Sequence, residues 1–111
     1  MKKGDVVLVP FPFTDLSGSK NRPALVLVVT ENDVTVAFIT SQMKWLEELD
    51  VKIEPAFENG LKQSSLIRIG KLTTLDKNMV IGKLGSIGIN ELQIVNQNLI
   101  QIFKLNPPDT E

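Results

Sequence analysis

Apolar and polar positions along the chain predict a series of short strands followed by one helix. Short apolar runs, bounded by turn-forming residues or alternating with polar ones, mark the strands. The expected strands cover residues 3–9, 22–29, 34–39, 51–54, 64–69 with a continuation over 72–76, and 79–87. The aliphatic side chains of 22–29 are nearly continuous, which predicts burial on both faces of a sheet. Turn chemistry at 31–33 predicts that the strands on either side of it form a hairpin.

Glycines and one polar segment interrupt this strand pattern. A kink is expected at Gly70, and Gly82 and Gly85 weaken the last strand, because glycine contributes no side chain to a ladder. Residues 41–49 predict a short helical turn with Trp45 and Leu46 packed beneath it.

The C-terminal segment changes to a helical period. Its apolar side chains recur at the spacing of one helix face: Leu92, Val95, Leu99, Ile102 and Phe103. Asn90 is expected to cap the first turn with Gln93 three residues on, and Ile89 and Ile94 to form a hydrophobic staple. Pro107-Pro108 ends the helix. We therefore expect a mainly β fold, a small barrel of about six strands with one short helix after the third strand and a C-terminal helix.

Length and composition favour a single domain. The chain has 111 residues, of which we assign 1–106 to the domain and 107–111 to a frayed tail. It contains no Cys and no His, which excludes disulfides, thiolate metal sites and histidine acid–base chemistry. Because no apolar run is long enough to span a bilayer and no signal-peptide pattern opens the chain, we expect a cytoplasmic protein without membrane contact.

The net charge of −1 conceals two basic blocks. Residues 1–30 carry four Lys/Arg against two acids, and residues 61–90 carry five against one, whereas 31–60 carry two against seven. A fold that joins the two blocks would form a basic binding face. The alternative is a set of solvated surface lysines.

Two candidate functional residues lie at the open end of the predicted hairpin. Residues 10–21 form a twelve-residue loop, and loops of this length are usually functional or disordered. Arg22 stands where this loop rejoins the sheet, and Thr40 follows the third strand, so the hairpin would bring the two together. The alternatives are a surface or ion-pairing arginine and a threonine that forms a turn or caps a helix. The chain has no phosphate-binding loop, dinucleotide fingerprint or metal-ligand spacing.

Three motifs resemble those of the MazF/PemK family of toxin endoribonucleases (mRNA interferases). The first motif matches GDVVLVPFPFTDLSGSKNRPALVL, the second AFITSQ and the third SSLIRIGKLTTLDKNMVIGKLGSI, with the strands in the same order. The resemblance implies a PemK-type barrel similar to SH3 folds, a homodimer, and a cognate antitoxin whose tail blocks the RNA groove. It also implies the toxin role of a type II toxin–antitoxin system.

The resemblance assigns the catalytic roles to Arg22 and Thr40. It implies a sequence-specific endoribonuclease that needs no metal or cofactor and cleaves single-stranded mRNA by attack of the 2′-hydroxyl, leaving a 2′,3′-cyclic phosphate and a 5′-hydroxyl. Arg22 would neutralise the phosphate, and Thr40 would donate a hydrogen bond to it. Arginine is a poor base near neutral pH, which leaves Asp15 and Asp76 as candidates for the proton acceptor.

Further residues are implied as substrate contacts. They are Ser17, Ser19, Lys20, Asn21, Ser41, Gln42, Arg68 and Asp76, with Lys71 and Lys77 as additional phosphate contacts. Phe11, Phe13 and Trp45 are the aromatic candidates for stacking on bases, and we expect at least two of them in the core.

One position departs from the family pattern. Thr73 stands where many relatives have an arginine directly before the residue that matches Thr74. This keeps open a second function, a toxin-like binding module without cleavage or an inhibitor of DNA gyrase. A plain SH3-like adaptor is disfavoured, because its peptide groove needs several aromatics and the chain has no Tyr and one Trp.

Overall fold

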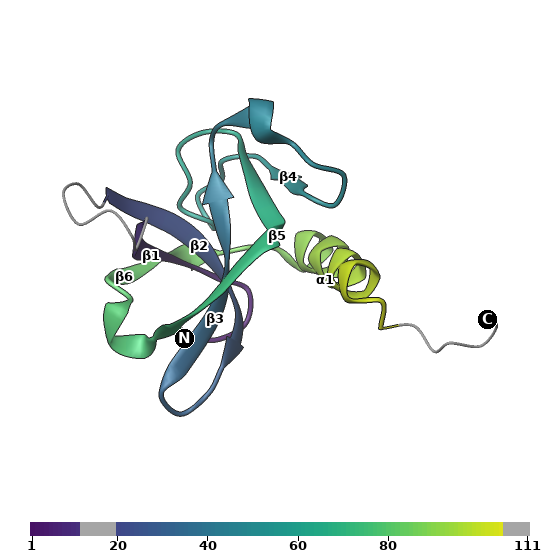
Figure 1. Cartoon of the computed structure of the whole chain (residues 1–111). Coiled ribbons are helices and arrows are strands. Elements are labelled where there is room, and N and C mark those ends of the chain that lie inside the picture. Colours follow the sequence, from purple (N-terminus) through teal and green to yellow (C-terminus); the bar gives the residue numbers. More distant parts are fainter. Residues whose placement is uncertain (12–19, 106–111) are drawn as a thin grey trace.

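Residues 1–11 and 20–105, described in a computed structural model of the chain, form an antiparallel sheet with a helix across one face (Figure 1). The strands are β1 (Asp5–Phe11), β2 (Lys20–Val29), β3 (Asp33–Thr40), β4 (Val51–Ile53), β5 (Ser65–Asp76) and β6 (Gly82–Ser86). Two single turns of 3₁₀-helix, η1 (Met43–Trp45) and η2 (Lys77–Met79), precede the helix α1 (Ile89–Phe103). The strand order is β4-β5-β3-β2-β1-β6, curled into a half-barrel with β4 and β6 at its edges. The predicted mainly β fold with a short helix after the third strand and a C-terminal helix is confirmed.

The β2–β3 hairpin forms around residues 31–33 as predicted. Its antiparallel pairs run from Val29–Val34 at the turn to Ala24–Phe38 at the open end. Residues 24–27 are buried in succession, which confirms burial on both faces for the middle of β2, whereas Val28 is 51% exposed and departs from the prediction over 22–29.

Strand pairing shortens the connection between β1 and β2. Pro10 pairs with Asn21, and Phe11 pairs with Lys20, so all four residues belong to strands. The predicted loop over 10–21 was therefore too long at both ends. Periodicity along one segment does not report how far a partner strand extends the ladder, which is why the sequence missed these pairs.

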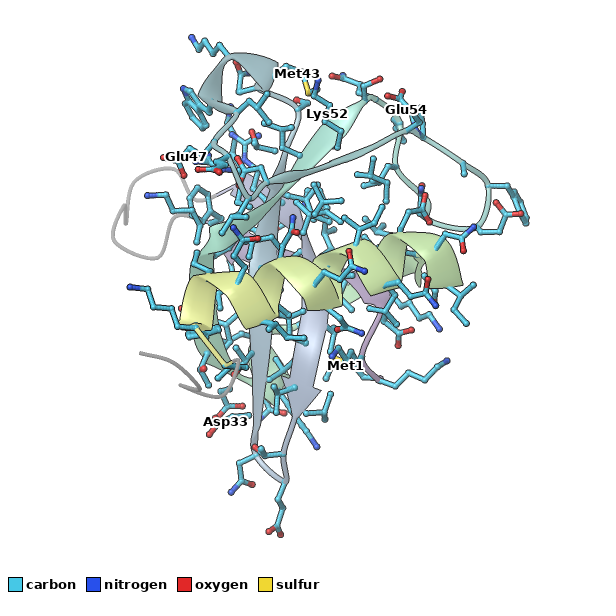
Figure 2. All side chains as sticks on the ribbon, turned by 90° about the vertical axis from the view of Figure 1, so that its right-hand side faces the viewer. Met1, Asp33, Met43, Glu47, Lys52 and Glu54 are labelled. Atoms are coloured by element: carbon cyan, nitrogen blue, oxygen red, sulfur yellow. The ribbon has the colours of Figure 1, made fainter. Side chains whose placement is uncertain are left out.

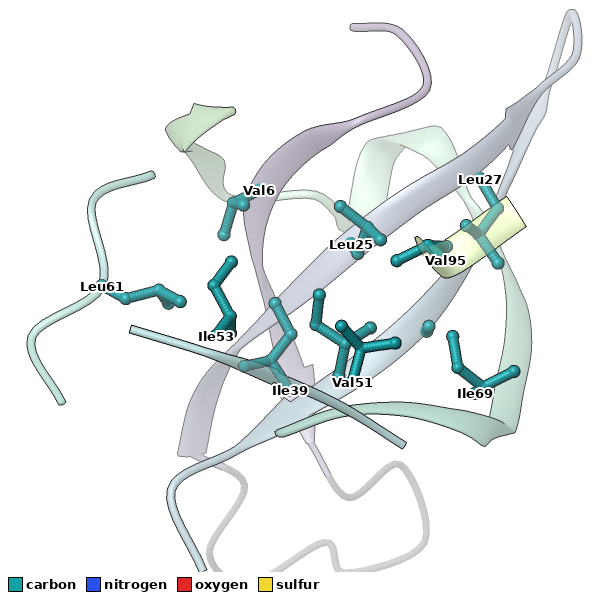
Figure 3. Close-up of a cluster of buried hydrophobic side chains, with 11 residues drawn as sticks. Val6, Leu25, Leu27, Ile39, Val51, Ile53, Leu61, Ile69 and Val95 are labelled. Atoms are coloured by element: carbon teal, nitrogen blue, oxygen red, sulfur yellow. The ribbon is translucent and has the colours of Figure 1, made fainter. Parts of the chain in front are cut away.

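Two apolar clusters occupy opposite faces of the sheet. The cluster beneath α1 contains Val6, Leu25, Leu27, Ala37, Ile39, Val51, Ile53, Leu61, Ile67, Ile69 and Val95 (Figure 3). The other contains Val7, Val9, Ala24, Val26, Val34, Val36 and Leu75. Successive residues of a strand alternate between the two clusters, as a pleated sheet requires. Figure 2 shows α1 lying across the strands, and its Val95 side chain is completely buried.

The helix begins earlier than the sequence indicates. Gly88 is its N-cap, and the Glu91 carboxylate accepts a hydrogen bond from the Gly88 N–H at 2.7 Å. The predicted cap at Asn90 and the staple of Ile89 and Ile94 are therefore wrong, because Ile89 already belongs to the first turn. Among the described residues, no helix has the length and apolar character needed to cross a membrane.

Of two further local predictions, one is confirmed and one is wrong. The kink at Gly70 is present, since the β3–β5 register jumps between the pairs Ile39–Ile67 and Ala37–Leu72. The expectation that Trp45 and Leu46 pack beneath the turn after β3 is wrong, because both side chains are about half exposed, at 51% and 47%.

Candidate functional site

A cleft of about 1140 Å³ opens at the free end of the β2–β3 hairpin. Its walls come from β1, β2, β3 and β5 and from the connection between β3 and β4. Basic residues from both basic blocks reach it, since Arg22 comes from β2 and Arg68 and Lys71 from β5. The fold therefore joins the two blocks at one site.

Arg22 and Thr40 both line this cleft. They lie two residues beyond Ala24 and Phe38, the last pair between β2 and β3. Past that pair, β2 continues to pair with β1 and β3 with β5, so the two strands diverge. Alternation along each strand keeps Arg22 and Thr40 on the same face of the sheet. The hairpin thus brings together the two residues that the sequence singled out.

A local hydrogen bond orients the Thr40 hydroxyl. Its oxygen accepts from the Gln42 N–H at 3.1 Å, which forms a small turn at the end of β3. Thr40 does not cap η1, whose N-cap is Gln42. A threonine hydroxyl has one donor as well as its acceptor lone pairs. Because this bond uses only an acceptor, the O–H remains able to donate to a ligand in the cleft.

The cleft carries excess positive charge. Arg22, Lys44 and Lys71 line it, and none of them forms an ion pair within residues 1–11 and 20–105. The carboxylate in the lining, Glu47, is already paired with Arg68. A concave surface with unpaired cations concentrates anions, so a phosphate-bearing ligand suits it.

Arg68 is committed to carboxylates of the β3–β4 connection. Its Nη2 donates to Glu47 Oε1 at 3.2 Å, and its Nε lies 2.9 Å from Asp50 Oδ2 in an ion pair without hydrogen-bond alignment. The side chain is only 9% exposed. The predicted phosphate contact of Arg68 would thus come from a guanidinium whose charge two carboxylates already offset. No local pattern in the sequence identifies these partners, although the acidic block over 31–60 is a signal that some basic residue is neutralised there.

The other predicted contacts fall into three groups. Gln42 and Lys71 line the cleft. The predicted residues that are described but do not line it are Lys20, Asn21, Ser41, Asp76 and Lys77. Ser17 and Ser19 lie outside the described residues, as do Asp15 and Phe13. Asp76 instead accepts a hydrogen bond from the Asn78 N–H at 2.8 Å and caps η2.

Two features of the wall bear on ligand choice. Thr73, the departure from the family pattern, lines the cleft, and so does Lys44, which no motif in the sequence marks. The Phe11 and Phe38 rings pack together with centroids 4.5 Å apart, at the side where β1 and β3 contribute to the wall. In the described part of the chain, no three His, Cys, Asp or Glu residues are grouped so as to hold a metal ion.

Comparisons with known proteins agree on one fold. The family model described as PemK-like, MazF-like toxin of type II toxin-antitoxin system matches residues 2–103. A MazE–MazF crystal structure (Form-II) from Deinococcus radiodurans is similar at 20% identity, with a TM-score of 0.76 over 96% of this chain and 97% of that one. Mycobacterium tuberculosis toxin MazF-mt6 is similar at 19% identity, with a TM-score of 0.71 over 93% of this chain and 99% of that one.

A third similar structure is an endoribonuclease in complex with its cognate antitoxin from Mycobacterial species. It shares 18% identity, with a TM-score of 0.69 and 97% of each chain covered. No curated protein sequence matches the chain. At these identities the structural likeness shows the fold, and the family model shows the membership.

Proposed function

The chain belongs to the PemK-like, MazF-like toxin family of type II toxin–antitoxin systems, and on that premise we propose that it is a sequence-specific endoribonuclease. Its substrate is single-stranded mRNA in the cytoplasm. The observation that carries the proposal is the shared cleft of Arg22 and Thr40, with lysines in the same wall that form no ion pair among the described residues. This arrangement offers a cation and a hydroxyl donor to one phosphate.

The proposed reaction uses the nucleophile that RNA itself provides. The 2′-oxygen attacks the adjacent phosphorus while the bond to the 5′-oxygen breaks, which leaves a 2′,3′-cyclic phosphate and a 5′-hydroxyl. The 2′-hydroxyl loses its proton, and the leaving 5′-oxygen gains one. No activated water is consumed, so the reaction has no step that requires a metal ion or cofactor.

Arg22 and Thr40 stabilise the charge that develops on the phosphate. The Arg22 guanidinium can donate two parallel hydrogen bonds to phosphate oxygens, which also aligns the phosphorus for in-line attack. Thr40 donates its O–H to a non-bridging oxygen. A single preorganised donor of this kind accelerates a reaction by about 10²–10³. Holding the 2′-oxygen in line adds a contribution that depends on placement alone.

We also propose a cognate antitoxin and a second copy of the chain as partners. Two of the similar proteins were solved in complexes, MazE–MazF and an endoribonuclease with its cognate antitoxin. For a homodimer, the end of α1 supplies exposed apolar side chains, with Phe103 57% and Leu105 65% accessible. Such side chains are typical of surfaces that another protein covers.

Cleavage of a long natural RNA by the purified protein in excess EDTA tests the function. We expect discrete fragments whose 5′ ends require phosphorylation before ligation and whose 3′ ends carry a cyclic phosphate. Fragments with 5′-phosphates would contradict the 2′-hydroxyl route. Intact RNA would contradict the nuclease altogether and favour the non-catalytic binding module or gyrase inhibitor.

A further inference from the structure

Trp45 occupies an unusual position for the single tryptophan of the chain. It ends η1, the 3₁₀ turn that follows β3, and its side chain lines the cleft with Arg22 and Thr40. The residue is 51% exposed, and no residue of η1 is buried. Figure 2 labels Met43 and Glu47 on either side of it along the chain, at the end of the molecule where β3 finishes.

A half-exposed tryptophan forgoes much of the stabilisation that full burial of its ring would give. Tryptophan has the largest apolar side chain, and burying an aromatic ring is a main source of stability in cores and interfaces. Here the side chain is half exposed and belongs to neither apolar cluster of the sheet. An exposed aromatic side chain inside a cleft is typical of a surface that binds a ligand.

The segment that carries Trp45 is held firmly in place. The Trp45 N–H donates to the Gln42 carbonyl at 3.0 Å, and the Glu47 N–H donates to Asp50 Oδ2 at 3.0 Å. Near the C-terminal end of this segment, the Asn98 side chain of α1 donates to the Leu49 carbonyl at 2.9 Å. These bonds connect the β3–β4 connection to itself and to the helix. A platform ordered before the ligand arrives loses little entropy on binding.

Arg68 joins this segment to β5 and to the indole. Its guanidinium carbon lies 6.0 Å from the centre of the Trp45 ring, within the range of a cation–π contact. The same guanidinium pairs with Glu47 and Asp50, so one buried side chain holds both the ring and the residues that follow it. Arg68 is thus a positioning residue for Trp45.

The charges around the ring favour a nucleic acid as its ligand. Lys44 precedes Trp45 directly, and Lys71 lies in the same wall, without ion pairs in the part of the chain that the structure describes. An aromatic face flanked by cations is how proteins bind single strands, since the ring stacks on a base while the cations neutralise the backbone. A protein partner would need matching apolar and acidic groups, whereas any single strand provides both a base and a phosphate.

We propose that Trp45 is a base-stacking platform of the cleft, which holds an unpaired nucleobase of single-stranded RNA against its indole ring. This inference rests on the proposed function for the identity of the ligand, but it concerns binding and not cleavage. Of the two stacking candidates that the structure describes, Trp45 lines the cleft with its side chain half exposed, whereas Phe11 is packed against Phe38; Phe13 lies outside the described residues. The sequence had no means of separating these two cases.

The chain itself supplies a direct test of the stacking. Because it has no Tyr and one Trp, ultraviolet-excited emission above the phenylalanine range comes from Trp45 alone. The unmodified protein is titrated with a pool of short single-stranded 2′-O-methyl RNA of randomised sequence, in which the attacking hydroxyl is blocked. We expect emission to be strongly quenched at saturation. An abasic strand of the same length is expected to bind about tenfold more weakly and to leave the emission nearly unchanged.

Three variants separate stacking from a general apolar effect. Binding is followed by the fluorescence anisotropy of a label on the RNA strand, a signal that does not come from Trp45. Trp45→Ala is expected to weaken RNA binding about tenfold. Trp45→Phe is expected to keep most of the parent's affinity, because phenylalanine retains a stacking face. Leu46→Ala is the matched control, since Leu46 is the exposed apolar neighbour outside the cleft lining and should bind as the parent does.

The possible outcomes distinguish failure of the stacking proposal from failure of the nuclease proposal. Binding without a change in Trp45 emission, or an equal loss in Trp45→Ala and Leu46→Ala, overturns the stacking proposal and favours a protein partner on this apolar patch. If the protein cleaves RNA while its Trp45 emission stays constant, the stacking proposal is contradicted and the proposed nuclease function is supported. Quenching by the blocked RNA without cleavage of natural RNA supports stacking and contradicts the nuclease. A protein that binds no single strand contradicts both.

Discussion

Arg22 and Thr40 line one cleft although no backbone pair joins them. β2 and β3 pair as far as Ala24 and Phe38, and beyond this pair each strand follows a different neighbour. The divergence separates the two strands while alternation keeps Arg22 and Thr40 on one face. Continued pairing would have placed their side chains in direct cross-strand contact. The open end of the hairpin therefore presents a guanidinium and a hydroxyl to the same cleft.

Arg22→Ala should slow RNA cleavage by at least about 10²–10³, because it removes the main donor to the phosphate. The side chain is exposed and forms no ion pair among the described residues, so the free energy of unfolding should change by less than about 0.5 kcal/mol. Single-turnover cleavage and urea denaturation measure the two effects. Lys52→Ala is the control, since Lys52 is an exposed cation on β4 outside the cleft lining. Full activity of Arg22→Ala would remove this residue from the mechanism.

Thr40→Val should slow cleavage by about 10², whereas Thr40→Ser should keep most of the activity because the hydroxyl donor is retained. Valine also removes the acceptor of the Gln42 N–H, which we expect to cost about 1 kcal/mol of stability. Cleavage rates under conditions where all three proteins are folded separate the two effects. An equal loss in the serine and valine variants would show that the methyl group or the backbone, and not the hydroxyl, matters at this position.

Thr73→Arg should strengthen RNA binding by adding a cation to the cleft wall. If the new side chain neutralises one more phosphate, a plot of log K against log salt should become steeper by about 0.7. Binding of a 2′-O-methyl strand at several salt concentrations measures this slope. Thr74→Arg is the control, because Thr74 is exposed outside the cleft lining and its hydroxyl bonds to that of Thr35 at 2.7 Å. Equal slopes in the two variants would contradict a phosphate contact at Thr73.

Asp5→Asn should make the stability of the protein less dependent on acid pH. Burial by itself would raise the pKa of Asp5, but hydrogen bonds from the Lys2 N–H and the Ser86 hydroxyl, together with Lys83, hold the pKa below its ordinary value. A carboxylate with a lowered pKa stabilises the fold fully above the pKa of about 4 that it has when unfolded, and this stabilisation is lost as the pH falls through the folded value.

We therefore expect Asp5→Asn to be less stable than the parent by about 2 kcal/mol at pH 7, with the difference shrinking below pH of about 4. Urea denaturation at both pH values checks this. Asp33→Asn, at an exposed strand end, should change stability little at either pH. A stability difference between Asp5→Asn and the parent that persists unchanged in acid would assign the effect of Asp5 to packing.

The strand pattern and its turns were accessible from local sequence. The aliphatic run of β2, the turn at 31–33 and the helical period after residue 88 each depend on residues close together along the chain. From the hairpin alone it followed that Arg22 and Thr40 would lie near each other. The family motifs then assigned roles to both residues, which the structure places in one cleft.

Other features depend on contacts between distant segments. Arg68 looked like a free phosphate ligand, but Glu47 and Asp50, about twenty positions earlier in the chain, neutralise it. Trp45 looked like a core residue because an apolar pattern does not say which face a neighbouring element covers. The cap of α1 is different, because the Glu91 carboxylate that bonds to the Gly88 N–H lies only three residues away and the contact is local.

Local patterning was therefore sufficient to predict most of the elements and the pairing of β2 with β3, since propensity and periodicity act over a few residues. The cleft itself was decided by tertiary structure. Long-range partners determine where β2 and β3 stop pairing, which cations of the described residues lack an ion pair, and which aromatic ring stays accessible. Those partners compete for the same backbone and side-chain groups, and only the folded chain decides between them.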